Sequence, residues 1–203
     1  MIRSEILNIL ENTWPTIIIC IIIIATLRLM YLYREKEKFI LYKELIDLLF
    51  MVYILCLFHT VTVQDNLLPG SNFIPFKEIF RYTPFSHLFI KNILGNIIMF
   101  IPYGFFVGHY LKLDKKIVGI LLALIVSVSI ELTQLAIGRV FDIDDIILNT
   151  IGGFIGVFLY TCLKFIKNIM PSFLKKDWFY NIIVLLIFII FFAFLNGTIE
   201  LGV

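Results

Sequence analysis

Residues 127–156 carry the densest group of side chains that could do chemistry. Most of the remaining chain is Ile, Leu and Phe. Ionisable groups beside apolar segments of membrane-spanning length are costly, and proteins that keep them generally use them. The polar side chains here are Glu131, Gln134, Arg139, Asp142, Asp144, Asp145 and Asn149. We therefore expect the functional site in this stretch, with Asn72, Asn92 and Asn96 beside it.

These residue types favour a ligand-binding site. Amide and carboxylate side chains hydrogen-bond well to hydroxyl and amide groups. The guanidinium of Arg139 could hold a phosphate or a carboxylate through two parallel hydrogen bonds. Carboxylates are also hard oxygen ligands, so Asp142, Asp144 and Asp145 are candidate ligands for Mg²⁺ or Ca²⁺, although their spacing matches no EF-hand loop. No cofactor other than such a cation is indicated.

A catalytic role is the main alternative. Glu131 is the candidate acid–base group, and it could act with Asp142 or Asp145 on a lipid headgroup. No nucleophile stands out, because Ser127 and Ser129 have no recognisable partner in the sequence and the three histidines are scattered. Binding is therefore favoured over catalysis.

A purely structural role is the second alternative. Polar residues between membrane helices stabilise packing by roughly 0.6 kcal/mol each, and pairs such as Glu131 with Arg139, or Asn96 with Asn149, could serve only that purpose. Several carboxylates in one place fit this role poorly, because like charges repel and an acid costs more to bury than an amide. A transporter is less favoured, because the far halves of the same helices are apolar and no internal repeat is evident.

The elements that must position these side chains are membrane-spanning helices. The chain has 203 residues, 61% hydrophobic, with a mean hydropathy of +0.99, whereas soluble domains hold about 45–50% apolar residues. The net charge of +2 is too small to indicate a nucleic-acid partner. A span needs about 20 residues, and we predict an all-α, polytopic bundle of six. The predicted spans are residues 15–33, 45–63, 92–111, 117–135, 145–165 and 180–195.

Lysine and arginine positions predict the orientation. The loops after the first, third and fifth spans hold 11 of the 17 basic residues, and the termini and other loops hold five, with Arg28 inside the first span. The positive-inside rule then places both termini outside. Residues 1–44 would form an N-terminal interfacial segment and an extra span. Residues 45–166 would form the core with an outer loop at 64–91, and residues 167–203 a cytoplasmic loop and the last span.

This orientation brings the polar residues to one depth, because the third span begins, the fourth ends and the fifth begins at the outer surface. Ser127, Glu131 and Gln134 recur at i, i+4 and i+7, so they share one helix face. Glycines at 152, 153 and 156 would let a neighbouring helix, with its own Gly104 and Gly108, approach closely. We expect the polar faces to point toward one another.

The loop at residues 64–91 is rich in aromatic residues with scattered Lys and Arg, a composition that suits the lipid headgroup zone. It has two interpretations. It is a re-entrant or interfacial segment that covers the polar cluster, or it is an ordinary connection anchored by its aromatic rings.

Four ordered motifs of this chain resemble the VanZ-like family. They are Asn-Phe-Ile-Pro-Phe at 72–76, Asn-Ile-Leu-Gly-Asn-Ile-Ile-Met-Phe-Ile-Pro-Tyr-Gly at 92–104, Ser-x-Ser-x-Glu-x-x-Gln at 127–134, and Arg-x-Phe-Asp-x-Asp-Asp with Asn-Thr-x-Gly-Gly-x-x-Gly at 139–156. The likeness covers about residues 45–203, which makes residues 15–33 an extra N-terminal span.

The resemblance implies a multi-pass protein of the bacterial cytoplasmic membrane that is associated with resistance to teicoplanin-type glycopeptide antibiotics. Glycopeptides act outside the membrane on lipid-linked cell-wall precursors. The expected partners of an outer-leaflet polar site are therefore membrane lipid headgroups, a lipid-linked peptidoglycan precursor or the glycopeptide itself.

Overall fold

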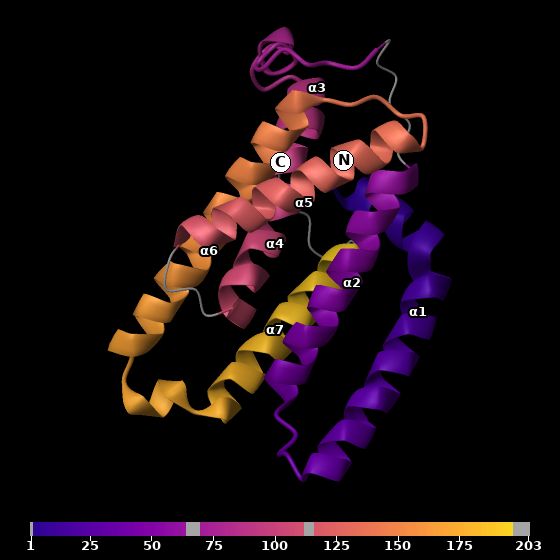
Figure 1. Ribbon diagram of the computed structural model, residues 1–203. Helices are drawn as coiled ribbons and strands as arrows, with labels where there is room; N and C mark the ends of the chain where they lie inside the picture. The colour runs from indigo at the N-terminus through magenta and orange to yellow at the C-terminus, as the bar shows by residue number, and fades with distance from the viewer. Residues whose placement is uncertain (1, 64–69, 112–115, 197–203) are drawn as a thin grey trace. The chain divides into compact units, whose positions relative to one another are not determined.

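The fold is a set of long apolar helices. The computed structural model describes residues 2–63, 70–111 and 116–196, and over these ranges it forms helices and no strand (Figure 1). Six of the described segments are long and apolar enough to cross a membrane: Leu10–Glu35, Leu41–Thr62, His87–Leu111, Lys116–Ala136, Ile143–Ile169 and Asp177–Phe194. The predicted all-α, multi-pass architecture is confirmed, and the orientation of the termini stays a prediction.

The helices begin earlier than the predicted spans because their first turns are polar or capped rather than apolar. In chain order they are α1 (Ile2–Glu35), α2 (Leu41–Val63), the 3-10 turn η1 (Ile79–Arg81), α3 (His87–Phe89), the π-helical turn η2 (Ile90–Leu94), α4 (Gly95–Leu111), α5 (Lys116–Ala136), α6 (Ile143–Ile169), the 3-10 turn η3 (Ser172–Lys175) and α7 (Asp177–Leu195). The N-terminal segment expected to lie along the interface, ahead of the span at 15–33, is continuous with that span in α1 over its described part.

The third span shows why sequence alone misplaces a helix start. Its helix begins at His87, because the Ser86 side chain accepts a hydrogen bond from the backbone N–H of Phe89 at 3.1 Å and so caps the first turn. The helix then passes through the π turn η2 before continuing as α4. A π turn inside a helix rotates the residues around it, and such turns are frequent at functional sites.

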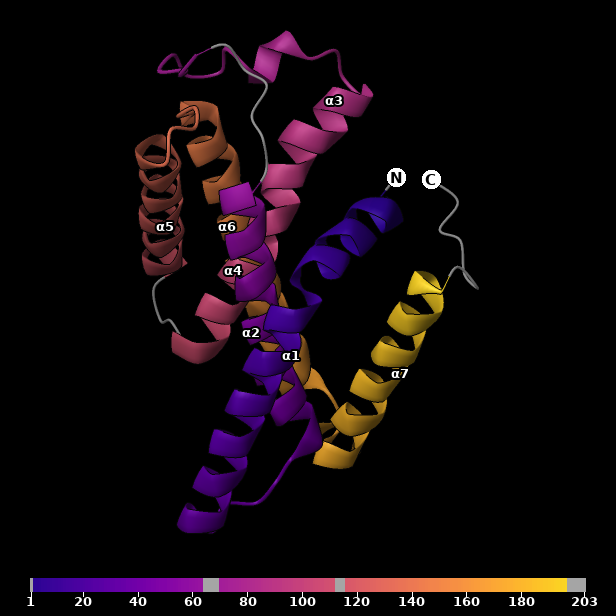
Figure 2. The same ribbon diagram turned by 90° about the vertical axis from the view of Figure 1, so that its right-hand side faces the viewer.

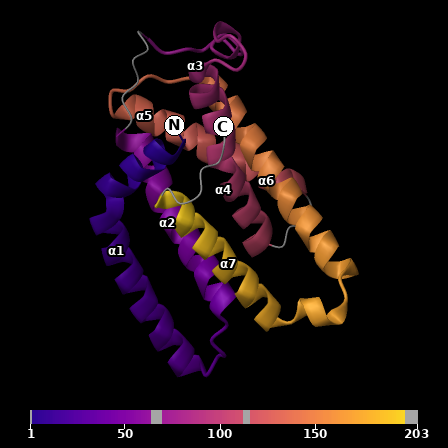
Figure 3. The same cartoon turned by 180° about the vertical axis from the view of Figure 1, so that it is seen from behind.

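The described chain divides into two compact units. The first comprises Met1–Thr60 and Met170–Val203. Within it, the guanidinium of Arg28 on α1 pairs with the carboxylate of Glu44 on α2 at 2.9 Å. The backbone N–H of Tyr42, at the start of α2, donates to the Asn181 side chain on α7 at 2.9 Å. Figure 3 shows α2 running between α1 and α7.

The second unit, Val61–Ile169, holds the helices α4, α5 and α6 (Figure 2). Its core contains Phe100 and Ala123, which have no exposed surface. Glycines allow α4 and α6 to meet backbone to backbone: a Cβ added to Gly104 would lie 2.0 Å from the carbonyl oxygen of Gly153. The predicted close approach of these helices through their glycines is confirmed. It fixes α4 against the first half of α6, where the polar side chains lie.

Candidate functional site

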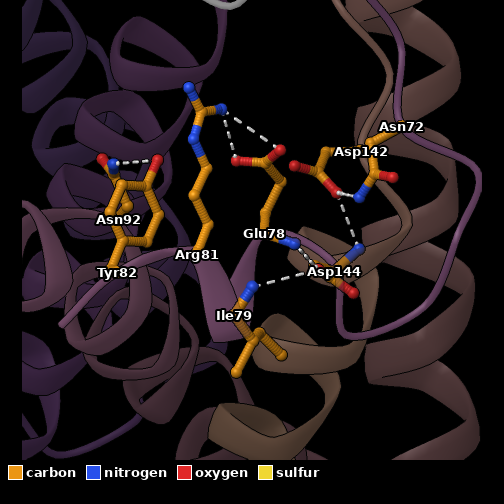
Figure 4. Close-up of polar contacts among 8 residues, drawn as sticks. All are labelled: Asn72, Glu78, Ile79, Arg81, Tyr82, Asn92, Asp142 and Asp144. Atoms are coloured by element: carbon orange, nitrogen blue, oxygen red, sulfur yellow. Dashed lines mark hydrogen bonds and ion pairs between the residues drawn. The ribbon is translucent and has the colours of Figure 1, made fainter. Parts of the chain in front are cut away.

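The turn before α6 is built around Asp142, at one end of the second unit. One carboxylate oxygen of Asp142 accepts hydrogen bonds from the backbone N–H of Asp144 and from the Asn72 side-chain amide, both at 2.9 Å (Figure 4). Asp142 thereby caps the N-terminus of α6. The backbone of Asn72 also pairs with the same turn, since its N–H donates to the carbonyl of Phe141 and its carbonyl accepts from Ile143.

Asp144 holds a second segment of the same loop. Asp144 is 1% exposed, and its side chain accepts three backbone N–H groups, from Phe76, from Glu78 at 2.7 Å and from Ile79 at 3.2 Å. Figure 4 shows the bonds from Glu78 and Ile79. Phe76 has a φ of +67°, a backbone conformation that is costly for a residue with a bulky side chain. The carboxylate therefore holds the loop in a shape it would not adopt unaided.

We call Asn72, Asp142 and Asp144 the loop anchor. The anchor ties residues 72–79 directly to the start of α6. The two interpretations of the loop, as a segment that covers the polar cluster or as an ordinary connection, both stay predictions. Burial raises the pKa of the Asp142 carboxyl above its ordinary value, while the hydrogen bonds from Asn72 and from the backbone of Asp144 oppose that shift.

A second polar group lies between the helices. The face of α5 that carries Ser127, Glu131 and Gln134 is buried, as its spacing predicts. Glu131, 2% exposed, accepts a hydrogen bond from the backbone N–H of Asp142 at 2.9 Å, so its carboxylate also serves the turn before α6. A buried carboxylate that accepts a backbone N–H stabilises the local fold.

The helices α4, α5 and α6 are joined by side-chain pairs. Asn96 on α4 donates to the carboxylate of Asp145 on α6, and Asn149 on α6 donates to the hydroxyl of Ser127 on α5 at 3.0 Å. The pair considered from the sequence, Asn96 with Asn149, is replaced by these two. We call Asn96, Ser127, Glu131, Asp145 and Asn149 the seam.

Two further candidates contact the last turn of α2. The side chains of Gln134 and Arg139 both donate to the backbone carbonyl of Val61, the former at 3.3 Å. The guanidinium of Arg139 also interacts electrostatically with Glu131 and Asp145. Arg139 is partly exposed, so it forms a positive edge to an otherwise acidic group.

Asn92 lies in the π turn and is partly exposed. Its side-chain amide donates to the hydroxyl of Tyr82 at 2.9 Å, which joins the loop to the beginning of the third span (Figure 4). Asn96, the next turn along, contacts Asp145 instead. The two asparagines therefore have different partners, although the sequence places them on one face.

The acids do not form a metal-binding arrangement in this part of the chain. Among residues 2–63, 70–111 and 116–196, no group of three or more His, Cys, Asp or Glu side chains could hold a metal ion. The physical reason is that Asp144 uses both carboxylate oxygens for backbone N–H groups, and Asp142 uses one oxygen for two donors. The cation considered for Asp142, Asp144 and Asp145 is not supported by this geometry.

Comparison with known proteins places this arrangement in a family. The sequence profile of the VanZ/LLP1 family matches residues 45–167, which is more than half of the chain. The chain belongs to the VanZ-like family. It is 34% identical over 105 residues to "Protein VanZ" of Enterococcus faecium; the matched region is 48% of this chain and 61% of that protein. No solved structure matches.

The VanZ-like match contains every residue of the loop anchor and of the seam. The helices α1 and α7 lie outside it, so the profile covers less than the 45–203 over which the motifs resemble the family. Within the matched region, burial separates the candidate residues. Asn72, Glu131, Gln134, Asp142, Asp144 and Asn149 are buried, and Asn92, Asn96, Arg139 and Asp145 are partly exposed.

Sequence reasoning missed two contributions. The first is the role of Asp144. Its position in the first turn of α6, directly after the cap at Asp142, could have indicated that it accepts backbone N–H groups. Acids in that turn favour the free N–H groups of a helix start, and here also those of a loop. The second is the set of backbone groups at Val61 and Phe76–Ile79, which carry no side-chain signal at all.

Proposed function

We propose that this VanZ-like protein contributes to resistance to teicoplanin-type glycopeptides, or to envelope homeostasis, at the outer face of the bacterial cytoplasmic membrane. It does so by binding the polar headgroup of a lipid or of a lipid-linked wall precursor. Membership of the VanZ-like family supports the link to glycopeptide resistance. The motifs that carry the family resemblance also contain the residues of the loop anchor and the seam.

The observation that carries the proposal is the position of Asp145. Asp145 keeps some exposed surface as a residue and its carboxylate is bonded to Asn96, whereas the acids around it are buried. It interacts electrostatically with Glu131, Asp142 and Asp144, and of these four acids it is the one that is not classed as buried. Partly exposed Asn92 and Arg139 lie on the same end of the unit and supply further hydrogen-bonding groups.

Binding fits this geometry better than catalysis. Glu131, the candidate acid–base group, is buried and accepts the backbone N–H of Asp142. Ser127 has no exposed surface, and its hydroxyl accepts a hydrogen bond from Asn149. A catalytic acid or nucleophile must reach the reacting atoms, and neither side chain is placed to do so.

Susceptibility measurements test the proposal. In a teicoplanin-susceptible bacterium that expresses the full chain, Asp145→Asn is expected to abolish protection while the protein remains at normal abundance in the membrane. The matched control is Thr150→Val on the same helix, whose hydroxyl donates to the carbonyl of Ile146 in its own helix at 2.7 Å. Full protection by abundant Asp145→Asn protein would refute the site.

Labelling tests the orientation separately. In a chain without Cys20, Cys56 and Cys162, a membrane-impermeant maleimide should label Lys77→Cys in the loop on intact cells. It should leave Lys164→Cys, near the other end of α6, unlabelled until the membrane is opened. The reverse pattern would place the site on the cytoplasmic side and contradict the proposed function.

A further inference from the structure

The seam has an excess of hydrogen-bond acceptors. The charged groups that interact with Asp145 in the described structure are three carboxylates, Glu131, Asp142 and Asp144, and one guanidinium, that of Arg139. Carboxylates accept hydrogen bonds and donate none when ionised. The local field is therefore negative, and it opposes the approach of a phosphate or carboxylate to Asp145.

A second observation shows that an acceptor in the seam lacks a donor. Asn149 is 2% exposed, and its side-chain nitrogen donates to Ser127. Its side-chain oxygen has no hydrogen-bond partner among the described residues. Leaving a buried acceptor unsatisfied is destabilising, so a ligand that brings a donor to this oxygen would gain binding energy.

The unsatisfied oxygen belongs to the same group of side chains as the carboxylates. Asn149 follows Asp145 by one helical turn on α6, and its partner Ser127 precedes Glu131 by one turn on α5. Because Asn149 bonds across to α5, its amide lies between the two helices, at the inner end of the seam. The side-chain oxygen of Gln134, at 8% exposure, is likewise unsatisfied within the described ranges.

We propose that the seam binds a primary ammonium group, presented by a lipid headgroup or by a soluble amine. This inference rests on the proposed function and names the chemistry of its ligand. An ammonium group carries three N–H donors and a positive charge. It can therefore satisfy acceptors and neutralise Asp145 together, and it reaches the seam through the partly exposed side chains of Asn96 and Asp145.

A comparison of primary with fully methylated amines tests whether the seam recognises the N–H donors or only the positive charge. A quaternary ammonium keeps the positive charge but has no N–H to donate. One lost charge-assisted hydrogen bond is worth about 1.5–3 kcal/mol, or about tenfold in affinity or more. The seam should therefore prefer ethanolamine headgroups to choline headgroups, whereas a purely electrostatic surface would treat them alike.

Native mass spectrometry of the purified full chain tests this preference. The protein is mixed with phosphatidylethanolamine, phosphatidylcholine or phosphatidylglycerol of identical acyl chains, and the bound fraction is measured. We expect about tenfold tighter retention of phosphatidylethanolamine than of phosphatidylcholine. Asp145→Asn should bring the ratio close to one, and Thr150→Val should leave it unchanged.

A second arm identifies the source of the amine. Thermal unfolding is measured with free ethanolamine or free choline in place of lipid. Stabilisation by ethanolamine without lipid preference indicates a soluble amine, and lipid preference without that stabilisation indicates a headgroup; either supports the proposal. Equal retention of the two lipids together with equal effects of the two free amines overturns it, as does a preference that survives in Asp145→Asn.

The outcomes for the ligand and for the function are distinguishable, and the wild-type lipid comparison stands even if a variant fails to fold. A chain that protects against teicoplanin but shows no ammonium preference overturns this inference and leaves the proposed function in place. A chain that shows the preference but gives no protection supports the inference and refutes the link to resistance.

Discussion

Asp144 and Asp145 are neighbours in sequence with the same side chain, and they occupy opposite environments. Asp144 is 1% exposed and accepts three backbone N–H groups from the loop. Asp145 is partly exposed and is bonded to a single described side chain, that of Asn96, with other carboxylates in electrostatic range. One helical step of about 100° is enough to send one acid to the loop and the other to the seam between helices.

The difference separates an acid that is committed to the loop backbone from one that is less buried and has fewer hydrogen bonds in the described structure. Three charge-assisted hydrogen bonds compensate for the burial of the Asp144 carboxylate. Asp145 has less compensation and more like charge around it, an arrangement that costs stability unless a ligand offsets it. The loop anchor therefore holds this end of the second unit together, and the seam is where the proposed ligand would gain binding energy.

The largest effect is expected from breaking the loop anchor. Asp144→Ala removes the acceptor of three backbone N–H groups, and we expect a loss of about 3 kcal/mol or more in the free energy of unfolding. Because residues 76–79 lose their attachment to α6, trypsin should cleave readily after Lys77 and Arg81. Thermal unfolding in detergent and limited proteolysis measure both consequences.

Asp145→Asn is the matched control for this prediction, since it changes the neighbouring acid and touches no loop backbone group. It should leave the tryptic pattern of the wild-type chain unchanged. If Asp144→Ala is as resistant to trypsin as the wild type, or if Asp145→Asn exposes the same sites, the contrast between the two acids is wrong.

A smaller effect is expected from separating the helices of the seam while the loop anchor stays in place. Gly104→Ala would put a Cβ 2.0 Å from the carbonyl oxygen of Gly153, so α4 must move away from α6. Overpacking of this kind costs about 1–3 kcal/mol. The movement carries Asn96 away from Asp145, and teicoplanin protection should fall while the loop stays resistant to trypsin.

The control lies on the same helix. A Cβ on Gly95 would meet only the carbonyl oxygen of Ile90, at an ordinary 3.8 Å. Gly95→Ala should therefore unfold at the wild-type temperature or slightly above it, because alanine favours a helix over glycine by about 1 kcal/mol. Equal melting of Gly104→Ala and the wild type would show that α4 and α6 are not held at this distance.

Much of this architecture could be predicted from the sequence, because apolar length and helical spacing are local properties. The six spans follow from runs of apolar residues, and the buried face of α5 follows from the spacing of Ser127, Glu131 and Gln134. The glycines of α6 predicted the close approach of α4. The starts of the helices could not be predicted as well, because Ser86 and Asp142 cap them through side-chain bonds that hydropathy does not detect.

The partners within the site could not be predicted, because they depend on the angles between helices. From the sequence, Asn96 could pair with Asn149. In the structure, Asn96 donates to Asp145 and Asn149 donates to Ser127. The same limit applies to Asp144, which looked like a cation ligand and serves backbone N–H groups contributed by residues more than 60 positions away. Such pairings are set by tertiary structure and leave no periodic signal.

The smallest effect is expected from Ser127→Ala, which sharpens the contrast within the seam itself. It removes the acceptor of the Asn149 nitrogen and leaves the Asn149 oxygen, so we expect a loss of about 1 kcal/mol in stability, at the low end of the cost of an unsatisfied buried donor, and an unchanged preference for ethanolamine lipids. Ser129→Ala is the control, because that hydroxyl is exposed and bonds to the carbonyl of Ile125 in its own helix. Loss of lipid preference in Ser127→Ala alone would mean that the hydroxyl, rather than the amide oxygen, meets the ligand. The ligand would then lie closer to α5 than to α6, and Asp145 would contact only the edge of the binding site.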